Sequence, residues 1–439
     1  MSNQLKTLIA DVLEKLSFEK LNPMQDAVIH EGVKGNDLML LSPTGSGKTL
    51  AFLTVLLHQL NSKKSGVQAM VVVPSRELAL QIETVFRALK SNWKVTCCYG
   101  GHSVKSEQNS LAEAPAIIIG TPGRIVDHIT RNSVDISHVS LVVLDEFDKS
   151  LQLGFQSQME YIFDTFKSKP QRILTSATGI DAIPDFVKGD YSKLDFRTHQ
   201  EVNLSLSLVR TPSDEKVETL MHLVKSFNQE PTLVFCNHRD AVERISALLS
   251  RHHFDHGIFH GALEQIDREK SLIKFRGGAH NVLIATDLAS RGLDIPEIRH
   301  VVHYQCPIHH SEFLHRNGRT ARMHADGSAY LILADDESLP EYLDKKLPVL
   351  KVNPFTGVVA EPDYVCVYIS AGKKDKISKG DVVGFLTKIG GLTGADIGLI
   401  AIIDNATYVA VKRNKTNAVL RKLKDQKIKK IRVKVEEAF

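Results

Sequence analysis

The sequence predicts an α/β fold made of two tandem parallel-sheet domains, followed by a small α+β domain. From residue 1 to about 200, short apolar runs alternate with helix-like stretches, and the same alternation restarts between about 215 and 335. Short apolar strands that are each followed by a helix are typical of a parallel sheet with helices on both faces. Beyond about residue 362, strands that alternate polar and apolar residues and a single helix predict a smaller mixed sheet.

The strands of the first domain are expected at the apolar runs in DLMLL, AMVVVP, AIIIG and LVVLDE. Those of the second domain are expected at TLVFCN, GIFHG, NVLIATD and HVVHYQCP. Ligands of such sheets collect at the carboxyl ends of the strands, so the residues that follow these runs are the candidates for a binding site.

A stretch from about 336 to 362 contains four prolines and shows neither the periodicity of a strand nor that of a helix. We therefore expect domains at 1–205, 206–345 and 363–439, with a linker at 346–362. The last domain should contain strands at YVCVYIS, IGLIAIID, TYVAVK and KIRVKV, and a helix at NAVLRKLKD.

Composition indicates a globular protein, because 43% of the 439 residues are hydrophobic and 24% are charged. No stretch approaches the roughly 18 apolar residues of a membrane span, and the start MSNQLK lacks a secretory pattern. The five cysteines have no metal-binding spacing, and Cys97 and Cys98 are expected in a strand. We expect reduced thiols and a cytoplasmic protein.

Positive charge is concentrated at the end of the chain. Residues 363–439 contain 16 Lys and Arg against 8 Asp and Glu, whereas the rest of the chain contains 39 against 43. A solvated basic surface would explain this excess. A polyanion-binding domain explains it better, and nucleic acid is the first candidate.

A phosphate-binding loop is predicted at SPTGSGKT, between the strand DLMLL and the next helix. In this context glycines let backbone N–H groups face phosphate oxygens, Lys48 adds a charge, and the Thr49 hydroxyl can ligate Mg²⁺. The predicted nucleotide-binding residues are Ser42, Pro43, Thr44, Gly45, Ser46, Gly47, Lys48 and Thr49. Ser42 departs from the usual first glycine of this pattern, and the alternative is an ordinary Gly/Ser turn.

Two adjacent carboxylates, Asp145 and Glu146, follow the apolar strand LVVL. Charge at this position is the natural complement of a phosphate loop. Asp145 can hold Mg²⁺, and Glu146 can orient and deprotonate the water that attacks the γ-phosphate. The alternative is a charged strand end that enters a loop.

Over residues 15–335 the chain resembles the DEAD-box family of ATP-dependent RNA helicases. The stretches that carry the resemblance are, in order, FEKLNPMQ, PSRELA, Gly100-Gly101, TPGR, DEFD in place of DEAD, SAT, LVFCN, HGALEQIDR, ATDLASRGLDI and HRNGRTAR. The resemblance implies two RecA-like domains and an RNA-dependent ATPase.

The resemblance also implies residue roles around ATP. Phe18 would stack on adenine, Gln25 would read its edge, and Asp294 would bind the ribose. Arg319 and Arg322 would be arginine fingers, and Asp148 belongs to the catalytic motif. Ser176, Ala177 and Thr178 would couple hydrolysis to RNA engagement. The RNA contacts implied in the two helicase domains are Arg76, Gly101, Thr121, Arg124, Asn237, Gly261, Arg268 and Thr286.

The motif DEFD has Phe147 where the family has alanine. Neighbouring side chains of an extended segment point to opposite sides. We therefore expect Phe147 to turn away from Glu146 and Asp148 and to pack into the core, and we expect activity to survive. Other departures are Leu21 for proline, Ala321 for glycine, and Asn317 for an apolar residue.

The last domain resembles the RNA-binding domain of DbpA-type helicases, a variant of the RNA-recognition-motif (RRM) fold. The stretches GKKDKISKGDVVGFL and GADIGLIAIIDNATYVAV carry this resemblance. In that family the domain binds a hairpin of large-subunit ribosomal RNA. Few stacking aromatic residues are evident here, so binding is expected to depend on basic residues: Lys373, Lys374, Lys376, Lys412, Arg413 and Lys415. The alternative is a domain that only raises general RNA affinity.

We therefore expect an ATP- and Mg²⁺-dependent RNA helicase that unwinds duplexes locally during assembly of the large ribosomal subunit and its 23S rRNA. We expect a monomer whose partner is RNA. The alternatives are a general or cold-shock mRNA helicase, an ATP-gated RNA clamp or chaperone, and a DNA translocase. RNA would be distinguished from DNA by its 2′-hydroxyl.

Overall fold

A computed structural model describes residues 3–101, 104–180, 182–197, 204–290, 298–320, 327–344, 346–358 and 360–438. The described residues form two compact units, one before and one after residue 203. The helices of the described residues are all too short or too polar to cross a membrane.

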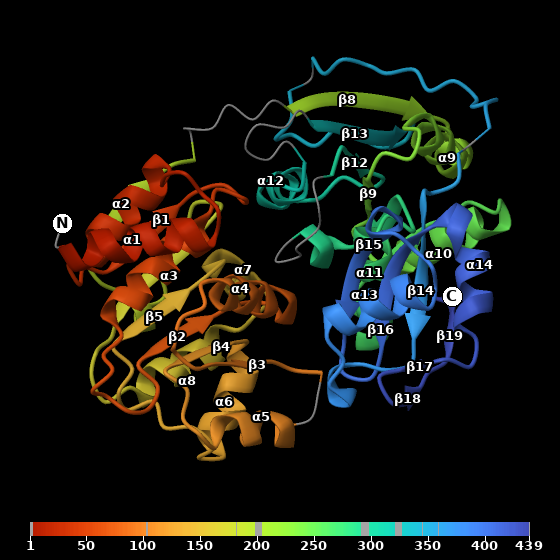
Figure 1. Ribbon diagram of the computed structural model, residues 1–439. Coiled ribbons are helices and arrows are strands. Elements are labelled where there is room, and N and C mark those ends of the chain that lie inside the picture. Colours follow the sequence, from red (N-terminus) through yellow and green to blue (C-terminus); the bar gives the residue numbers. More distant parts are fainter. Residues whose placement is uncertain are drawn as a thin grey trace. The chain divides into compact units, whose positions relative to one another are not determined.

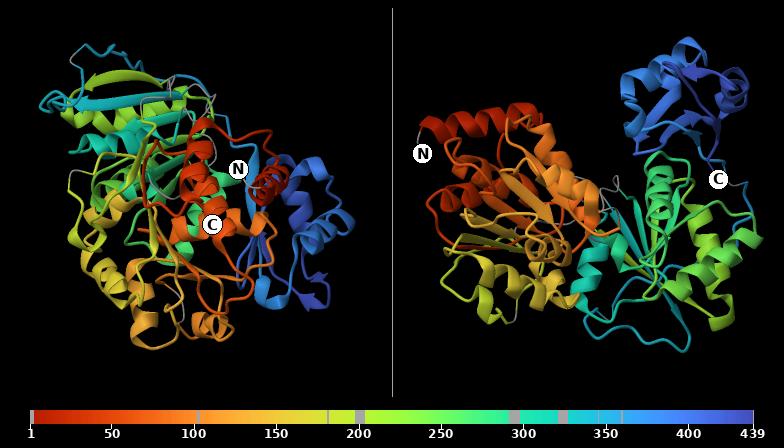
Figure 2. Two further views of the ribbon diagram at one scale, coloured as in Figure 1. Left: turned by 90° about the vertical axis from the view of Figure 1, so that its left-hand side faces the viewer. Right: turned by 90° about the horizontal axis from the view of Figure 1, so that it is seen from below.

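The first unit is a parallel sheet of seven strands between two layers of helices (Figures 1 and 2). The strands stand in the order β3 (Val95–Cys98), β4 (Ile117–Gly120), β2 (Ala69–Val72), β5 (Leu141–Leu144), β6 (Gln171–Ser176), β1 (Leu38–Leu41) and β7 (Ser192–Asp195). Apolar clusters fill both sides of this sheet, which explains why its central strands are unbroken apolar runs.

The helices divide between the two faces of the sheet. One face is covered by α1 (Asn3–Lys15), α2 (Pro23–Gly32), α3 (Lys48–Gln59) and α4 (Arg76–Ala88). The other face is covered by α5 (Val104–Leu111), α6 (Pro122–Thr130), α7 (Phe147–Gln152), α8 (Gln156–Thr165) and the short η1 (Asp185–Val187).

The second unit begins with a parallel sheet of six strands. Their order is β10 (Gly257–Phe259), β11 (Val282–Ala285), β9 (Thr232–Phe235), β12 (His300–His303), β13 (Gly327–Ala334) and β8 (Leu204–Thr211). Its helical segments are η2 (Ser213–Glu215), α9 (Lys216–Ser226), α10 (Arg239–Arg251), α11 (Gln265–Arg276), η3 (Asp287–Ser290) and α12 (His310–Asn317). Helices α9 and α10 pack on one face, and α12 packs on the other.

The second unit ends in a small domain whose four strands are all antiparallel. They stand in the order β15 (Ile397–Ile402), β16 (Thr407–Lys412), β14 (Tyr364–Ile369) and β19 (Val435–Glu437). Helices α13 (Lys379–Lys388) and α14 (Arg413–Leu423) share a core with one face of this sheet. Short turns η4 (Lys373–Asp375) and η5 (Gly394–Asp396) precede α13 and β15.

The predicted fold class is confirmed: two parallel-sheet domains precede a small α+β domain. The single strand expected at KIRVKV is wrong, however. This stretch contributes β18 (Ile431–Arg432) to a hairpin with β17 (Lys427–Ile428), and β19 begins only at Val435. The hairpin turn includes Lys429 with a φ of +53°, a conformation that no local pattern of lysines predicts.

Phe147 packs into the core, as expected, but for a different reason. It is fully buried, and its ring meets that of Phe186 edge-on at a centroid distance of 6.4 Å. The segment is not extended: Glu146 has a left-handed backbone with a φ of +50°, and Phe147 begins helix α7. The expectation from strand alternation is therefore wrong, and the turn of the backbone at Glu146 is what sends Phe147 into the core.

We predict that Phe147→Ala, which restores the family's usual motif, destabilises the first unit by roughly 3–5 kcal/mol, because it leaves a cavity beneath the carboxylates. Urea unfolding measures this loss. Phe18→Ala is the matched control, since Phe18 is 54% exposed and its loss should change stability little. Equal stability of the two variants would contradict the prediction.

Candidate active site and RNA-binding surface

The phosphate loop follows β1 and leads into α3. Gly45 and Gly47 have φ values of +82° and +87°. Residues with a side chain rarely adopt this left-handed conformation. The Lys48 ammonium donates to the carbonyls of Ser42 and Pro43, each at 2.9 Å. The Ser42 hydroxyl donates to that of Ser46 at 2.8 Å, so serine at the first position stabilises the curl of the loop.

The residues before α2 support this loop from the side. Asn22 and Gln25 form a capping box at the start of α2, with Pro23 in the first turn. The same side chains then reach the loop: Asn22 Nδ2 donates to Ser46 O at 2.9 Å, and Gln25 Nε2 donates to Gly47 O at 3.3 Å. A Cβ at position 47 would lie 2.4 Å from Gln25 Nε2, so a larger residue would displace this side chain as well as strain the left-handed backbone.

The carboxylates follow β5, which is separated from β1 by β6. Asp145 follows β5 and accepts a hydrogen bond from the hydroxyl of Thr175 in the adjacent strand β6. The backbone N–H of Glu146 points at Asp145 Oδ1 at 3.2 Å. The left-handed conformation of Glu146 costs on the order of 1 kcal/mol and turns the chain sharply out of the sheet.

The SAT segment connects both motifs. The Ser42 N–H donates to Ser176 O at 3.0 Å, which joins the start of the phosphate loop to β6. The Thr178 hydroxyl donates to Asp148 Oδ2 at 2.7 Å, which joins the same segment to the fourth residue of DEFD. The strand β6 therefore lies between the two motifs and bonds to each.

The electrostatics of this site fit a divalent cation. Asp145 is buried, and burial raises the pKa of its carboxyl, while the nearby Lys48 ammonium and the Thr175 hydroxyl act in the opposite direction. A buried carboxylate is stabilised by further positive charge. Asp145 and the half-buried Thr49 supply the oxygen ligands that Mg²⁺ prefers.

The predicted RNA-contacting residues of the first unit follow three neighbouring strands of the same sheet, β2, β4 and β3. Arg76 begins α4 after β2, and its guanidinium lies 4.7 Å from the centre of the Tyr99 ring. A Cβ at Gly101 would lie 3.2 Å from Arg76, so these two positions adjoin. Thr121 precedes α6, and its N–H donates to Cys98 O at 3.0 Å.

Arg124 is less accessible than expected because it faces a buried acid. Its Nε lies 3.6 Å from Glu107 Oε2, and the same oxygen lies 2.6 Å from His128 Nε2. Glu107 and His128 were not predicted, since a single acid in a polar helix gives no local signal of burial. Their contacts position Arg124 at the start of α6.

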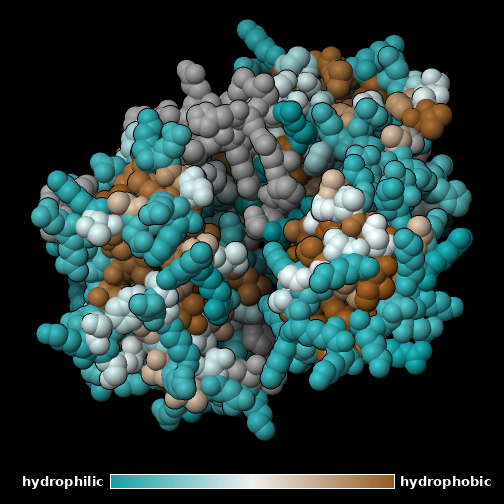
Figure 3. Space-filling model, viewed as in Figure 1, coloured by the Kyte–Doolittle hydropathy of each residue, from teal (hydrophilic) through white to brown (hydrophobic). Residues whose placement is uncertain are grey.

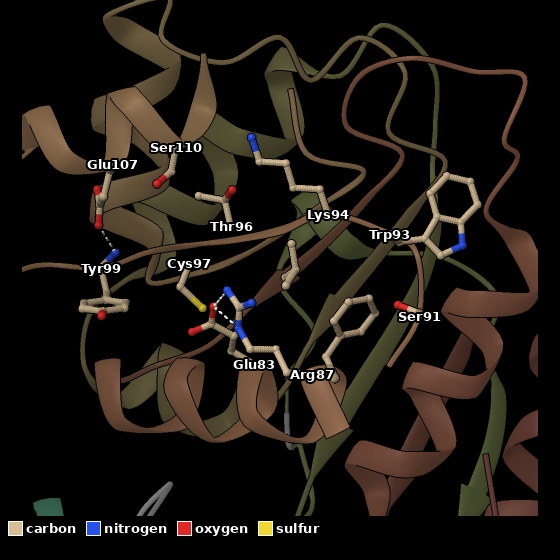
Figure 4. A pocket seen from close by; sticks show the side chains of 12 residues that line it. Glu83, Arg87, Ser91, Trp93, Lys94, Thr96, Cys97, Tyr99, Glu107 and Ser110 are labelled. Carbon is tan, nitrogen blue, oxygen red and sulfur yellow. Dashed lines mark hydrogen bonds and ion pairs between the residues drawn. The ribbon is translucent and has the colours of Figure 1, made fainter. Parts of the chain in front are cut away.

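A surface pocket of about 540 Å³ adjoins this group at the edge strand β3 (Figure 4). Trp93 and Lys94 stand on one side of the pocket, and the ion-paired Glu83 and Arg87 stand near Cys97. None of the predicted nucleotide-binding residues lines this pocket.

In the second unit, three predicted RNA-contacting residues follow the adjacent strands β9, β10 and β11. These are Asn237, Gly261 and Thr286; Arg268 lies in the first turn of α11. The Asn237 amide is held by bonds to Cys306 O at 2.9 Å and from Arg316 at 2.8 Å. Its orientation is therefore fixed before any RNA contact.

Arg316 is a residue that the sequence analysis missed. It is fully buried, and Nε and Nη2 donate to the two carboxylate oxygens of Asp287 at 2.7 and 2.8 Å. A third bond runs to Gln305 O at 2.7 Å. The spacing of Arg316, Arg319 and Arg322 by three residues is the signal that could have found it. Arg319 lies buried just after α12, whereas Arg322, Ala321 and Asp294 lie outside the described residues.

The basic residues predicted in the last domain form two groups, at opposite ends of β15. Lys373 and Lys374 donate their N–H groups to Ile403 O and Asp404 O, beyond the carboxyl end of β15. Lys412 and Lys415 lie near Asp396, which precedes β15. Hydrogen bonds from Thr393 lower the pKa of the Asp396 carboxyl, and the charges of Lys415 and Lys412 lower it further. Six strand residues span roughly 20 Å, so one small contact cannot include both groups.

Arg413 and the hairpin lysines differ from expectation. Arg413 is half-buried, and its guanidinium donates to Pro362 O at 2.6 Å. Lys429 was not predicted, yet its ammonium lies 2.8 Å from both Lys376 O and Asp381 Oδ2, which brings the hairpin beside Lys376. The run KIKKIRVK is the local sequence signal that the basic surface extends to the hairpin. Figure 3 shows hydrophilic residues at the border of this domain.

Three family models match the chain in succession. Residues 22–186 match the DEAD/DEAH box helicase model, 215–324 the helicase conserved C-terminal domain, and 366–437 the DbpA RNA binding domain. The ATP-dependent RNA helicase DbpA of Escherichia coli is 33% identical over 95% of this chain and 94% of that protein. The chain belongs to the DEAD-box RNA helicases, with a DbpA-type domain.

Other relatives agree with this family. The ATP-dependent RNA helicase DbpA of Bacillus subtilis is 29% identical and covers 99% of this chain and 98% of that protein. Among solved structures, Mss116p bound to single-stranded RNA and AMP-PNP is 26% identical, with a TM-score of 0.67 over 75% of this chain and 72% of that one. Dbp5 of S. cerevisiae shares the fold, at 24% identity and a TM-score of 0.69 over 76% of this chain and 88% of that chain.

Asn317, which departs from the family's apolar residue, pairs with a buried histidine. The ring Nε2 of His303 lies 2.9 Å from Asn317 Oδ1, and both side chains are buried. Burial, and then the charge of Arg316, lowers the pKa of His303 to about 3. The neutral imidazole is therefore the form that the fold accepts.

We predict that His303 makes the second unit sensitive to acid. Unfolded chains protonate histidine near pH 6.5 but the folded unit does not, so the stability that His303 contributes is fully present above that pH and is lost progressively as pH falls toward 3. Between pH 6.5 and 5 this loss amounts to about 2 kcal/mol. Urea unfolding of wild type and His303→Gln at both pH values measures it, and an equal pH dependence of the two proteins would contradict the prediction.

Proposed function

We propose that this protein is an RNA-stimulated ATPase that couples ATP hydrolysis to local, non-processive unwinding of RNA duplexes. The observation that carries this proposal is the arrangement at one edge of the first sheet. The phosphate loop follows β1, the SAT segment follows β6 and the carboxylates follow β5, and these three strands are consecutive in the sheet. The candidate RNA contacts follow the next three strands, β2, β4 and β3. The two sets meet where β5 pairs with β2.

In the proposed reaction, the loop's N–H groups and Lys48 bind the β- and γ-phosphates, and Phe18 stacks on the adenine. Thr49 and Asp145 would hold Mg²⁺, which supplies charge neutralisation between the phosphates. Glu146 orients the attacking water and accepts its proton. Because Asp145 and Thr175 are bonded, the ligand oxygens are held in place before ATP arrives.

We infer that β6 is the coupling element of the first unit. Its end bonds to the phosphate loop through Ser176 and to Asp148 through Thr178. A change at the γ-phosphate therefore reaches the SAT segment by direct hydrogen bonds. Arg319 and Arg322 are proposed to stabilise the transition state, and Asp294 to bind the ribose, as the family resemblance implies.

We further propose that the last domain directs the helicase to large-subunit ribosomal RNA during ribosome assembly. Support comes from the match to the DbpA RNA binding domain and from the two exposed groups of basic residues. Contacts of this kind bind the phosphate backbone and the shape of a folded RNA. A general RNA helicase is the alternative outcome.

Replacing Glu146 by glutamine should lower RNA-stimulated ATP turnover by about 10²–10⁴-fold, because the base is lost while shape is kept. Binding of ATP should persist. Steady-state turnover and nucleotide titration measure both. Gln156→Glu, at an exposed position of α8, is the control and should leave turnover unchanged.

Comparison of turnover with RNA, with DNA and without nucleic acid distinguishes the remaining alternatives. Stimulation by RNA alone supports the helicase, and equal stimulation by DNA favours a translocase. An absence of RNA stimulation in wild type would leave only the clamp. The clamp hypothesis depended on slower hydrolysis caused by Phe147, and that side chain is buried in the apolar core of the first unit.

Crosslinking tests whether the last domain directs the helicase to large-subunit ribosomal RNA. Full-length protein crosslinked to total cellular RNA should enrich large-subunit ribosomal RNA, and the chain ending at residue 362 should lose this enrichment while it keeps RNA-stimulated turnover. Sequencing of the crosslinked RNA measures the distribution. A flat distribution for the full-length protein would refute targeting to large-subunit ribosomal RNA and leave the helicase assignment intact.

A further inference from the structure

The first sheet has an open edge at β3. This strand pairs with β4 on one side, and among the described residues no strand pairs with its other side. An open strand edge presents unpaired N–H and C=O groups, which can bind another extended chain. The open side of β3 therefore offers the backbone groups that such a chain needs.

The hydrogen bonds of β3 show which residues face this open side. The carbonyls of Lys94 and Cys98 accept hydrogen bonds from β4 and from the residue that follows it. Because the backbone groups of alternate residues point to the same side of a strand, Thr96 also faces β4, whereas Val95 and Cys97 face outward. Within the described part of the chain, neither outward residue has a backbone hydrogen bond, so the N–H and C=O groups of both remain open to a partner.

The edge is closed at the carboxyl end of β3. The outward N–H of Tyr99 donates to Glu107 Oε1 at 2.9 Å, so a side chain of α5 takes the place of a further strand there (Figure 4). Glu107 is buried, and its other oxygen lies 2.6 Å from His128 Nε2. This carboxylate therefore ends the open stretch, which runs from Trp93 to Cys97.

The pocket of about 540 Å³ runs along this open stretch, between α4 and α5 (Figure 4). Phe86 of α4 and Ser110 of α5 line its two sides. Trp93 stands at the end opposite Glu107, where it is half-buried and packs against the same apolar core as Phe86. In peptides that add a strand to a sheet edge, side chains of alternate residues enter pockets of this kind and give specificity.

The charge available at the start of the open stretch is positive. Glu83 of α4 is already paired, because it accepts two hydrogen bonds from Arg87. The Lys94 ammonium donates to the carbonyl of Glu113 and lies 3.6 Å from the carboxylate of the same residue, whose side chain is 93% exposed. An exposed ion pair of this kind is weak. Lys90, four residues earlier, is exposed as well, so an acidic occupant would be favoured here.

An extended protein segment fits these features better than nucleic acid, which has no regular ladder of N–H and C=O groups to pair with β3. We propose that the open edge of β3 binds an extended, acidic segment of a partner protein, which pairs with Val95 and Cys97 and places an apolar side chain in the pocket beside Trp93. None of the predicted nucleotide- or RNA-binding residues lines the pocket, so this docking does not depend on the proposed function.

Trp93 is the only tryptophan of the chain, so its fluorescence reports on the pocket directly. The probe is the peptide Asp-Val-Thr-Phe-Thr-Val-Asp, blocked at both ends, which alternates apolar and polar side chains and contains no tryptophan. Titration of this peptide into the full-length protein should change the Trp93 emission and reach saturation. An absence of saturable binding would overturn the proposal.

Methylation of the peptide backbone tests the pairing with β3. Alternate N–H groups of an extended chain point to the same side, so methylation of one alternate set removes the bonds to β3, whereas methylation of the other set leaves them intact. One set should weaken binding about tenfold or more, and the other should change it less than about twofold. Equal effects of the two sets would overturn the proposal. This test uses the wild-type protein, so it does not depend on the folding of a variant.

Charge reversal tests the two lysines. Lys90→Glu/Lys94→Glu should weaken binding of the aspartate peptide about tenfold and should strengthen binding of the same peptide with lysine at both ends. The matched control is Lys6→Glu/Lys169→Glu, at exposed positions on α1 and before β6, and it should change neither. Circular dichroism verifies that both variants fold, and equal effects of the two variants would contradict the proposed charge complementarity.

Single-stranded RNA is the alternative occupant of this surface. Oligouridylate is therefore titrated into the same proteins. If it changed the Trp93 emission, lost this effect in the Lys90→Glu/Lys94→Glu variant, and the peptide gave no response, the surface would belong to RNA and the proposal would be overturned.

Discussion

The pairing of β6 with β5 on one side and β1 on the other is the constraint on which the nucleotide site depends. Parallel pairing places the carboxyl ends of the three strands at one edge. Hydrogen bonds from Thr175 to Asp145 and from Ser42 to Ser176 then hold the carboxylates and the phosphate loop against the same strand. A shift of one residue in this register would turn the Thr175 side chain away from Asp145.

At three places in the molecule, a buried charged side chain lies beside groups that compensate its charge. Asp145 faces Lys48 and a hydroxyl, Arg316 is satisfied by Asp287 and a carbonyl, and Glu107 lies between His128 and Arg124. Removing one partner from such a group leaves an uncompensated charge, which costs far more than an exposed ion pair contributes. These contacts fix the orientation of the functional residues beside them before any ligand binds.

The C-terminal domain combines two surfaces with different physical properties. Its sheet offers small apolar side chains to α11, while lysines occupy the turns and the hairpin. An apolar face gains free energy by excluding water, whereas phosphate-binding lysines must remain in contact with it. Separation of the two surfaces allows one small domain to bury apolar side chains against Ile273 and Ala279 and still present positive charge.

The sequence alone determined the fold class, the family and the positions of the motifs, because strand periodicity and the order of short motifs are local properties. It also indicated that Phe147 would be buried. Only the tertiary structure decided how: the left-handed turn at Glu146 begins a helix where alternation predicted an extended segment. The same holds for Arg316, Glu107 and Lys429. Each depends on residues far apart in the chain, and burial or close approach of such residues leaves no trace in the local pattern of amino acids.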